Sequence, residues 1–189
     1  GRYTSVYDGK SLFAEMMEHS DYKSPVQLSF IKRVLLVRSD LSFYEGIVHE
    51  DELFTFLLLM HSKRAGYLDK ALYYKRIRSD SITGTAVTQR NFLGCLCVLE
   101  QMMDYYSQNT FRAHIDSAVR MRLARFFTTT YVRYRSLSEE ERHVNRDGKR
   151  RLFRLMQEVG YLGSWKVFLK CRLEILYRLY RELRFGQRH

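Results

Sequence analysis

The side chains best placed to do chemistry are three consecutive acidic residues, Glu50, Asp51 and Glu52, which follow His49 and precede the apolar run 53–60. This group has three interpretations. It could start a helix, because a carboxylate in a first turn interacts favourably with the helix dipole, by about 0.3–1 kcal/mol. It could bind a metal ion, or one carboxylate could act as a general base that accepts a proton from a hydroxyl group. Composition alone favours the helix start.

The metal interpretation fails on spacing. The letters HEDEL begin like the zinc motif H-E-x-x-H, but Leu53 occupies the fifth position. His49 and His61 are too far apart to replace the helical histidine pair. The chain's three cysteines give no four-ligand zinc spacing, and their odd number predicts a reducing compartment.

The elements that must position the acidic residues are predicted from hydrophobic periodicity. Apolar side chains recur at helical spacing in residues 8–19, and the apolar run after Glu52 predicts a helix that is buried on most sides. Residues 30–37 predict one or two helical turns. Residues 65–68 and 71–78 predict two short strands.

A polar segment, residues 79–89, divides the chain near residue 86. Beyond it, long helices are predicted over residues 88–106, 111–135 and 164–185. Ser138 stands three residues before Glu141 and predicts a capping box at a further helix start. We therefore expect two domains, a mixed one over residues 1–85 and an all-helical one over residues 86–189.

Two sequence blocks carry a resemblance to a known family. The first reads FYEGIVHEDELF and the second, further along, reads ALYYKRIRSDSIT. Together and in this order they resemble the C-terminal half of family 2 glycosyltransferases, particularly the bacterial enzymes that build capsular polysaccharide, exopolysaccharide and O-antigen. The resemblance covers about residues 25–83. It implies the acceptor-side part of an α/β GT-A fold, here followed by a helical extension, in a predominantly helical chain.

The resemblance implies roles for the residues around the first block. Asp51 matches the catalytic base, which deprotonates the acceptor hydroxyl so that it attacks the anomeric carbon of a nucleotide sugar, usually with inversion. Glu50 would orient the acceptor or shape the environment of the base. His49 would line the same cleft.

In the second block, Arg76 and Arg78 match the family's two basic positions. On a strand they would point the same way, and their guanidinium groups suit a diphosphate or a polar acceptor. A solvated strand face is the competing interpretation. Ser81 falls where the family often places an active-site loop.

The first half of the family's fold has no counterpart in this sequence. That half carries an Asp-x-Asp motif that holds Mg²⁺ or Mn²⁺ on the donor diphosphate, and the motif is absent here. We therefore expect a fragment that lacks its N-terminal half and is inactive alone, while the intact enzyme uses the metal.

Charge predicts the partners of the tail. Residues 120–189 contain 18 Lys and Arg against 7 Asp and Glu, so they hold the whole net charge of +11. Residues 164–185 form a basic amphipathic pattern suited either to an anionic membrane surface or to an ordinary helical core. A homodimer contact is a further prediction. Signatures of nucleic-acid binding are lacking, so no nucleic-acid partner is expected.

The sequence thus predicts a cytoplasmic glycosyltransferase, peripheral on the inner face of the cell membrane. It would use a nucleotide-sugar donor and a saccharide or lipid-linked acceptor in surface polysaccharide biosynthesis. The competing prediction is a non-catalytic basic helical module for membrane attachment or protein assembly.

Overall fold

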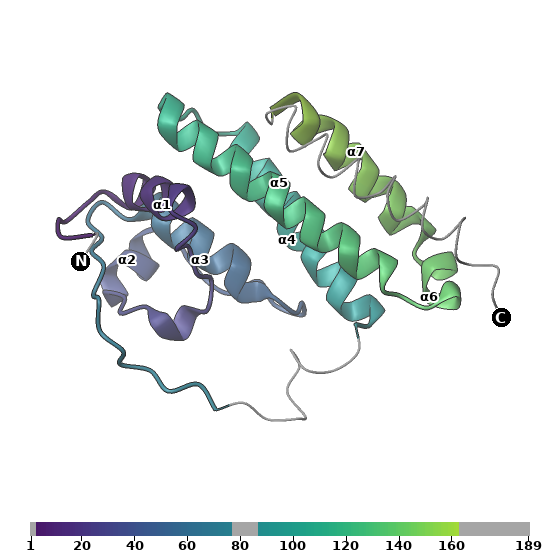
Figure 1. Ribbon diagram of the computed structural model, residues 1–189, viewed down its shortest axis with the longest axis horizontal. Helices are drawn as coiled ribbons and strands as arrows, with labels where there is room; N and C mark the ends of the chain where they lie inside the picture. Colours follow the sequence, from purple (N-terminus) through teal and green to yellow (C-terminus); the bar gives the residue numbers. More distant parts are fainter. Residues whose placement is uncertain (1–2, 77–86, 163–189) are drawn as a thin grey trace.

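The computed structural model describes residues 3–76 and 87–162, and within these ranges the chain is mostly helical (Figure 1). The helices in chain order are α1 (Gly9–Glu18), the 3₁₀ turn η1 (Val26–Leu28), α2 (Arg33–Arg38), α3 (Glu50–His61), α4 (Gln89–Ser107), α5 (Ala113–Arg135), α6 (Glu139–Val144) and α7 (Arg146–Leu162). The predicted helix over 164–185 lies outside the described residues.

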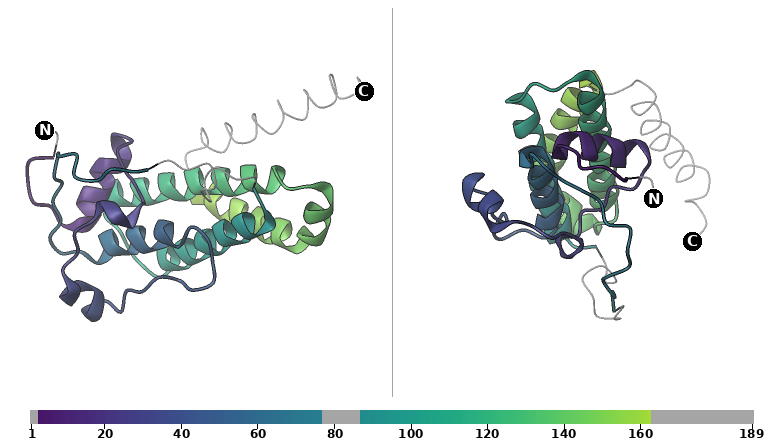
Figure 2. Two further views of the ribbon diagram at one scale, coloured as in Figure 1. Left: turned by 90° about the horizontal axis from the view of Figure 1, so that it is seen from below. Right: turned by 90° about the vertical axis from the view of Figure 1, so that its left-hand side faces the viewer.

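Helices α4 and α5 form the centre of the fold. They pack along each other, α7 lies against both, and α1 and α3 cover them towards the other end (Figures 1 and 2). Helix α1 contacts α5 and α3, while α3 also contacts α4. Residues from both sides of the predicted boundary near residue 86 therefore pack together.

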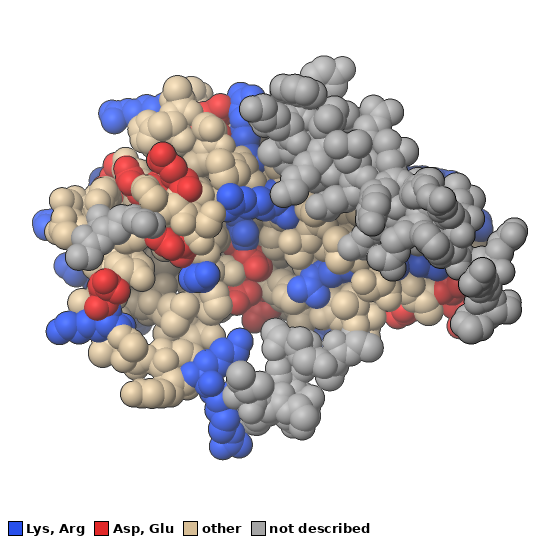
Figure 3. Space-filling model, viewed as in Figure 1, with Lys and Arg blue, Asp and Glu red and all other residues tan. Residues whose placement is uncertain are grey.

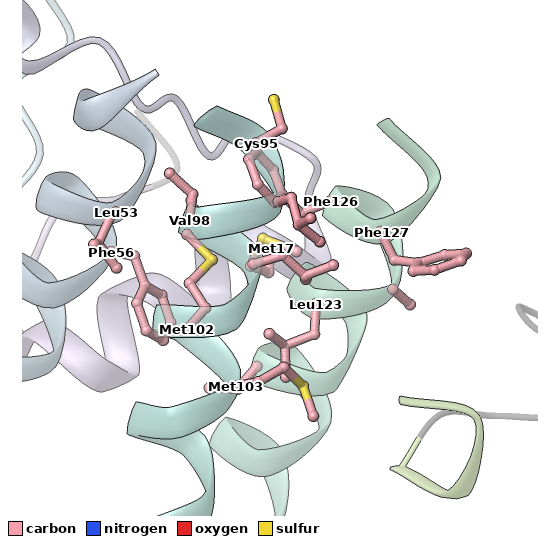
Figure 4. Close-up of a cluster of buried hydrophobic side chains, with 14 of the residues drawn as sticks. Met17, Leu53, Phe56, Cys95, Val98, Met102, Met103, Leu123, Phe126 and Phe127 are labelled. Carbon is pink, nitrogen blue, oxygen red and sulfur yellow. The ribbon is translucent and has the colours of Figure 1, made fainter. Parts of the chain in front are cut away.

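One hydrophobic cluster holds these helices together. Side chains of α3, α4 and α5 meet in it, as Figure 4 shows. Phe56 of α3 is fully buried, and its ring meets those of Phe13 and Tyr105 edge-on, at centroid distances of 5.6 Å and 5.7 Å. The same cluster includes Leu123 of α5. Helix α3 buries side chains between Leu53 and Met60, so the packing of the helix holds its first turn in place.

Local signals in the sequence explain where several helices begin. Asp8 caps α1 by accepting a hydrogen bond from the backbone N–H of Ser11 at 3.1 Å. The predicted capping box at α6 is confirmed, because Ser138 and Glu141 each accept a hydrogen bond from the other's backbone N–H. The predicted starts and ends of α4 and α5 are confirmed to within two residues.

The predicted strands are wrong where the structure describes them. Residues 71–76 have no regular secondary structure, and within residues 65–68 only Ala65 pairs, in a single antiparallel bridge with Tyr7. A strand needs a neighbouring strand to pair its backbone, and no strand occurs in the described ranges. Residues 77 and 78 lie outside those ranges.

Acidic and basic side chains are interspersed on the face of the molecule shown in Figure 3. The basic excess predicted for residues 120–189 falls partly on described helices and partly beyond residue 162. Among the described helices, none combines the length and the apolar composition needed to cross a bilayer.

Candidate active site

The acidic residues Glu50, Asp51 and Glu52 form the first turn of α3, so the prediction of a helix start is confirmed. His49 precedes them at the N-cap position in the left-handed conformation, with φ 71° and ψ 27°. Few residues other than glycine adopt this conformation, although histidine does so more often than most. The turn therefore combines three carboxylates with an unusual backbone geometry.

Asp51 is half-buried at this turn. Burial raises the pKa of its carboxyl group, and the charges of Glu52 and Glu50 raise it further, against the lowering effect of nearby backbone N–H groups. A carboxylate with a raised pKa holds a proton more readily than an ordinary aspartate. Asp51 is thus suited to accept a proton during a reaction.

Glu52 lies in a different environment from Asp51. Its carboxylate forms an ion pair with the guanidinium group of Arg122 in α5. The Arg122 guanidinium carbon also stacks over the rings of Tyr22, at 4.8 Å, and Phe126, at 5.1 Å. The ion pair therefore joins the candidate base's turn to the centre of the helical bundle.

His49 is half-buried and lies near both positive and negative charges. Burial lowers the pKa of its imidazole, and the charge of Arg133 lowers it further, against the raising effect of Glu52 and Glu50, so the net shift favours the neutral ring. Its Nε2 atom is buried and has no hydrogen-bond partner among the described residues, and the same holds for the hydroxyl group of Tyr22. Buried polar atoms normally have partners, so both atoms are candidates for contact with a ligand.

The second sequence block, of which residues 71–76 are described, does not join the first turn of α3. Arg76 is exposed on an irregular segment, and no hydrogen bond or ion pair joins it to the described residues around Asp51. The prediction that Arg76 and Arg78 share one face of a strand is therefore wrong at Arg76, which does not lie in a strand. Arg78 and Ser81 lie outside the described ranges.

The sequence singles out Glu52 only as one of the three acidic residues, and it gives no role to Arg122 or Tyr22, which the structure places beside Glu52. Arg122 lies next to Leu123 on a helix with buried apolar side chains, and its own side chain is only 12% exposed. An arginine inside an apolar helical pattern is the one sequence signal that could have indicated it, because arginine is rarely buried without a partner.

A metal ion on the donor diphosphate is implied by the family resemblance. Across residues 3–76 and 87–162, no group of three or more His, Cys, Asp or Glu side chains is arranged to hold a metal ion. The described residues therefore do not fit such an ion.

Gly94 of α4 allows the bundle to approach the segment before the acidic turn. A Cβ atom on Gly94 would lie 2.4 Å from the carbonyl oxygen of Val48, one residue before His49. The replacement Gly94→Ala should therefore destabilise the fold by about 1–3 kcal/mol, the usual effect of overpacking. Urea denaturation measures the change.

Gly66 provides the matched control, because a Cβ atom there meets nothing within 4 Å. Gly66→Ala should change stability by less than about 0.5 kcal/mol, as at most surface positions. Equal unfolding midpoints for the two variants would contradict the close contact between α4 and Val48.

Comparison with known proteins adds no relative to this picture. No family model matches the chain, no curated protein matches it, and no solved structure matches it.

Proposed function

We propose that this chain is the acceptor-side part of an inverting family 2 glycosyltransferase of the GT-A type, with Asp51 as its general base. The observation that carries the proposal is the environment of Asp51. It is a half-buried carboxylate with a raised pKa in the first turn of α3, at the position that the sequence resemblance assigns to the base. A base whose pKa is closer to the working pH transfers protons more efficiently.

The proposed reaction is a single displacement. Asp51 removes the proton from an acceptor hydroxyl group as the acceptor oxygen bonds to the anomeric carbon of the nucleotide sugar. The bond between that carbon and the diphosphate oxygen breaks, and the nucleoside diphosphate leaves with the electron pair. Attack from the opposite face inverts the anomeric configuration.

The neighbouring residues have supporting roles in this proposal. Glu50, in the same turn, orients the acceptor, and the neutral imidazole of His49 contacts it through a hydrogen bond. The sequence resemblance alone supports a role for Arg76, Arg78 and Ser81 in binding the donor diphosphate or the acceptor. The Mg²⁺ or Mn²⁺ of the intact enzyme and the donor nucleotide belong to the half of the fold with the Asp-x-Asp motif.

The proposed setting is surface polysaccharide biosynthesis on the cytoplasmic side of the membrane. The donor is a nucleotide sugar and the acceptor is a saccharide or a lipid-linked saccharide. An enzyme that acts on a lipid-linked acceptor works at the membrane surface. A cytoplasmic protein held peripherally on the inner face fits this requirement.

A transfer assay tests the proposed function. The protein that joins this chain to its donor-binding half is incubated with a panel of nucleotide sugars and lipid-linked or free saccharides. The expected result is one glycosylated product for each nucleoside diphosphate released, with inverted anomeric configuration by NMR. A product of retained configuration, or no transfer with any donor, would contradict the proposal.

A further inference from the structure

The ion pair between Glu52 and Arg122 connects two parts of the chain that are distant in sequence. Glu52 belongs to the first turn of α3, and Arg122 lies in the middle of α5. Both side chains are largely shielded, with exposed fractions of 24% and 12%. An ion pair that is shielded from water is weakened less by salt than a surface pair.

Arg122 is held on its other sides as well. Its guanidinium group lies against the rings of Tyr22 and Phe126, and planar guanidinium groups stack favourably on aromatic faces. The segment that carries Tyr22 is itself fixed to α3, because Thr55 donates a hydrogen bond to the carbonyl oxygen of Ser24 at 2.6 Å. The ion pair and the two rings therefore restrict the orientation of Arg122, although its Nε atom is buried and has no hydrogen-bond partner among the described residues.

A fixed Arg122 fixes Glu52, and Glu52 is the immediate neighbour of Asp51 in the same helical turn. We propose that Arg122 is a positioning residue for glycosyl transfer, which holds the first turn of α3 through Glu52 and so sets the location of the Asp51 carboxylate. This inference rests on the proposed function. Under this proposal the helical part of the chain, which includes α5, contributes directly to the active site.

The charge of Glu52 also contributes to the electrostatic environment of Asp51. The charged or titratable groups around Glu52 come from α3, α4, α5 and the two segments that precede α2 and α3. They are Glu50, Asp51, Cys95, Arg122, Arg133, Tyr22 and His49. The Glu52 charge raises the pKa of Asp51, whereas burial raises the pKa of Cys95 to about 12 and keeps that thiol neutral.

A second ion pair in the same molecule serves as the matched control. Arg151 of α7 pairs with Glu100 of α4 through two hydrogen bonds. This pair has the same chemistry but includes no residue of α3. Its loss should affect the packing of the bundle without moving the turn that carries Asp51.

The test uses four variants of the active protein, Arg122→Met, Arg122→Lys, Glu52→Gln and Arg151→Met. Arg122→Met should lower kcat by roughly 10- to 100-fold, the usual effect of a small misplacement of a catalytic group, with KM for the nucleotide sugar within about twofold. Arg122→Lys should recover part of the loss, because lysine keeps the charge but not the planar fork. Arg151→Met should keep the parental kcat.

Glu52→Gln tests the electrostatic role with an isosteric side chain that can still accept a hydrogen bond from Arg122. Without the Glu52 charge the pKa of Asp51 falls, so the acid limb of the pH–rate profile should move to lower pH. This result can be read even if Arg122→Met fails to fold.

Two outcomes would overturn the positioning role while leaving the proposed function intact. They are an unchanged kcat in Arg122→Met, or in Arg122→Lys where the Met variant does not fold, and an equal loss of kcat in Arg151→Met and Arg122→Met. An unchanged acid limb in Glu52→Gln would instead contradict the electrostatic effect of Glu52 on Asp51. Either of the first two outcomes counts against Arg122 alone if Asp51→Asn is inactive in the same assay. If Asp51→Asn keeps the parental rate, the proposed function fails as well.

Discussion

Replacing Asp51 by Asn should lower kcat for sugar transfer by about 10²- to 10⁴-fold, the usual contribution of a general base. Asparagine has nearly the same shape as aspartate but cannot accept the acceptor proton at neutral pH. The binding of the nucleotide sugar should change little. Initial rates at saturating donor and acceptor measure the loss, and Asp40→Asn is the control, because Asp40 is exposed and outside the proposed site.

The same replacement should leave the protein at least as stable as the parent at pH 7. The folded-state pKa of Asp51 is raised, so its contribution to stability is largest when the carboxyl group is protonated. That contribution is lost as the pH rises from the unfolded pKa through the folded pKa. Asparagine has no charge to bury, so a melting temperature below that of the parent would contradict this description of the turn.

Replacing Phe56 by Ala should destabilise the fold by about 3–5 kcal/mol, as is typical of a buried phenylalanine. Phe56 is fully buried and meets Phe13 of α1 and Tyr105 of α4 edge-on. Its loss would open a cavity where three helices meet. Since domains are typically stable by only 5–15 kcal/mol, this loss is a large fraction of the total stability. Chemical denaturation measures the change.

Phe30 is the matched control, because its side chain is 91% exposed. Phe30→Ala removes the same atoms without opening a cavity, so stability should change by less than about 0.5 kcal/mol. If both phenylalanine variants unfolded at the same denaturant concentration, the location of the core between α1, α3 and α4 would be wrong.

The parts of the fold that could be predicted from the sequence depend on local interactions. The start of α3 at Glu50 follows from an acidic first turn before an apolar run, and the capping box at Ser138 involves residues three positions apart. The predicted turn of helix within residues 30–37 appears as α2 (Arg33–Arg38). Helical periodicity acts over a few residues and can be counted directly.

The parts that could not be predicted depend on which distant segments meet. Alternating side chains in residues 71–76 are compatible with a strand, but the backbone there has no strand to pair with in the described residues. The sequence singled out Asp51 but not the partner of Glu52. Arg122 lies 70 residues further along the chain, and no periodic pattern relates two residues at that separation.

The central claim is that the Asp51 carboxylate accepts the acceptor proton, and the pH dependence of kcat/KM tests it most directly. The parent should lose activity tenfold per pH unit below one pKa, and that pKa should lie above the usual aspartate value because burial raises it. The residual rate of Asp51→Asn should show no such limb. If Asp51→Asn kept the same acid limb at a rate near that of the parent, another group would be the base and the account would be wrong.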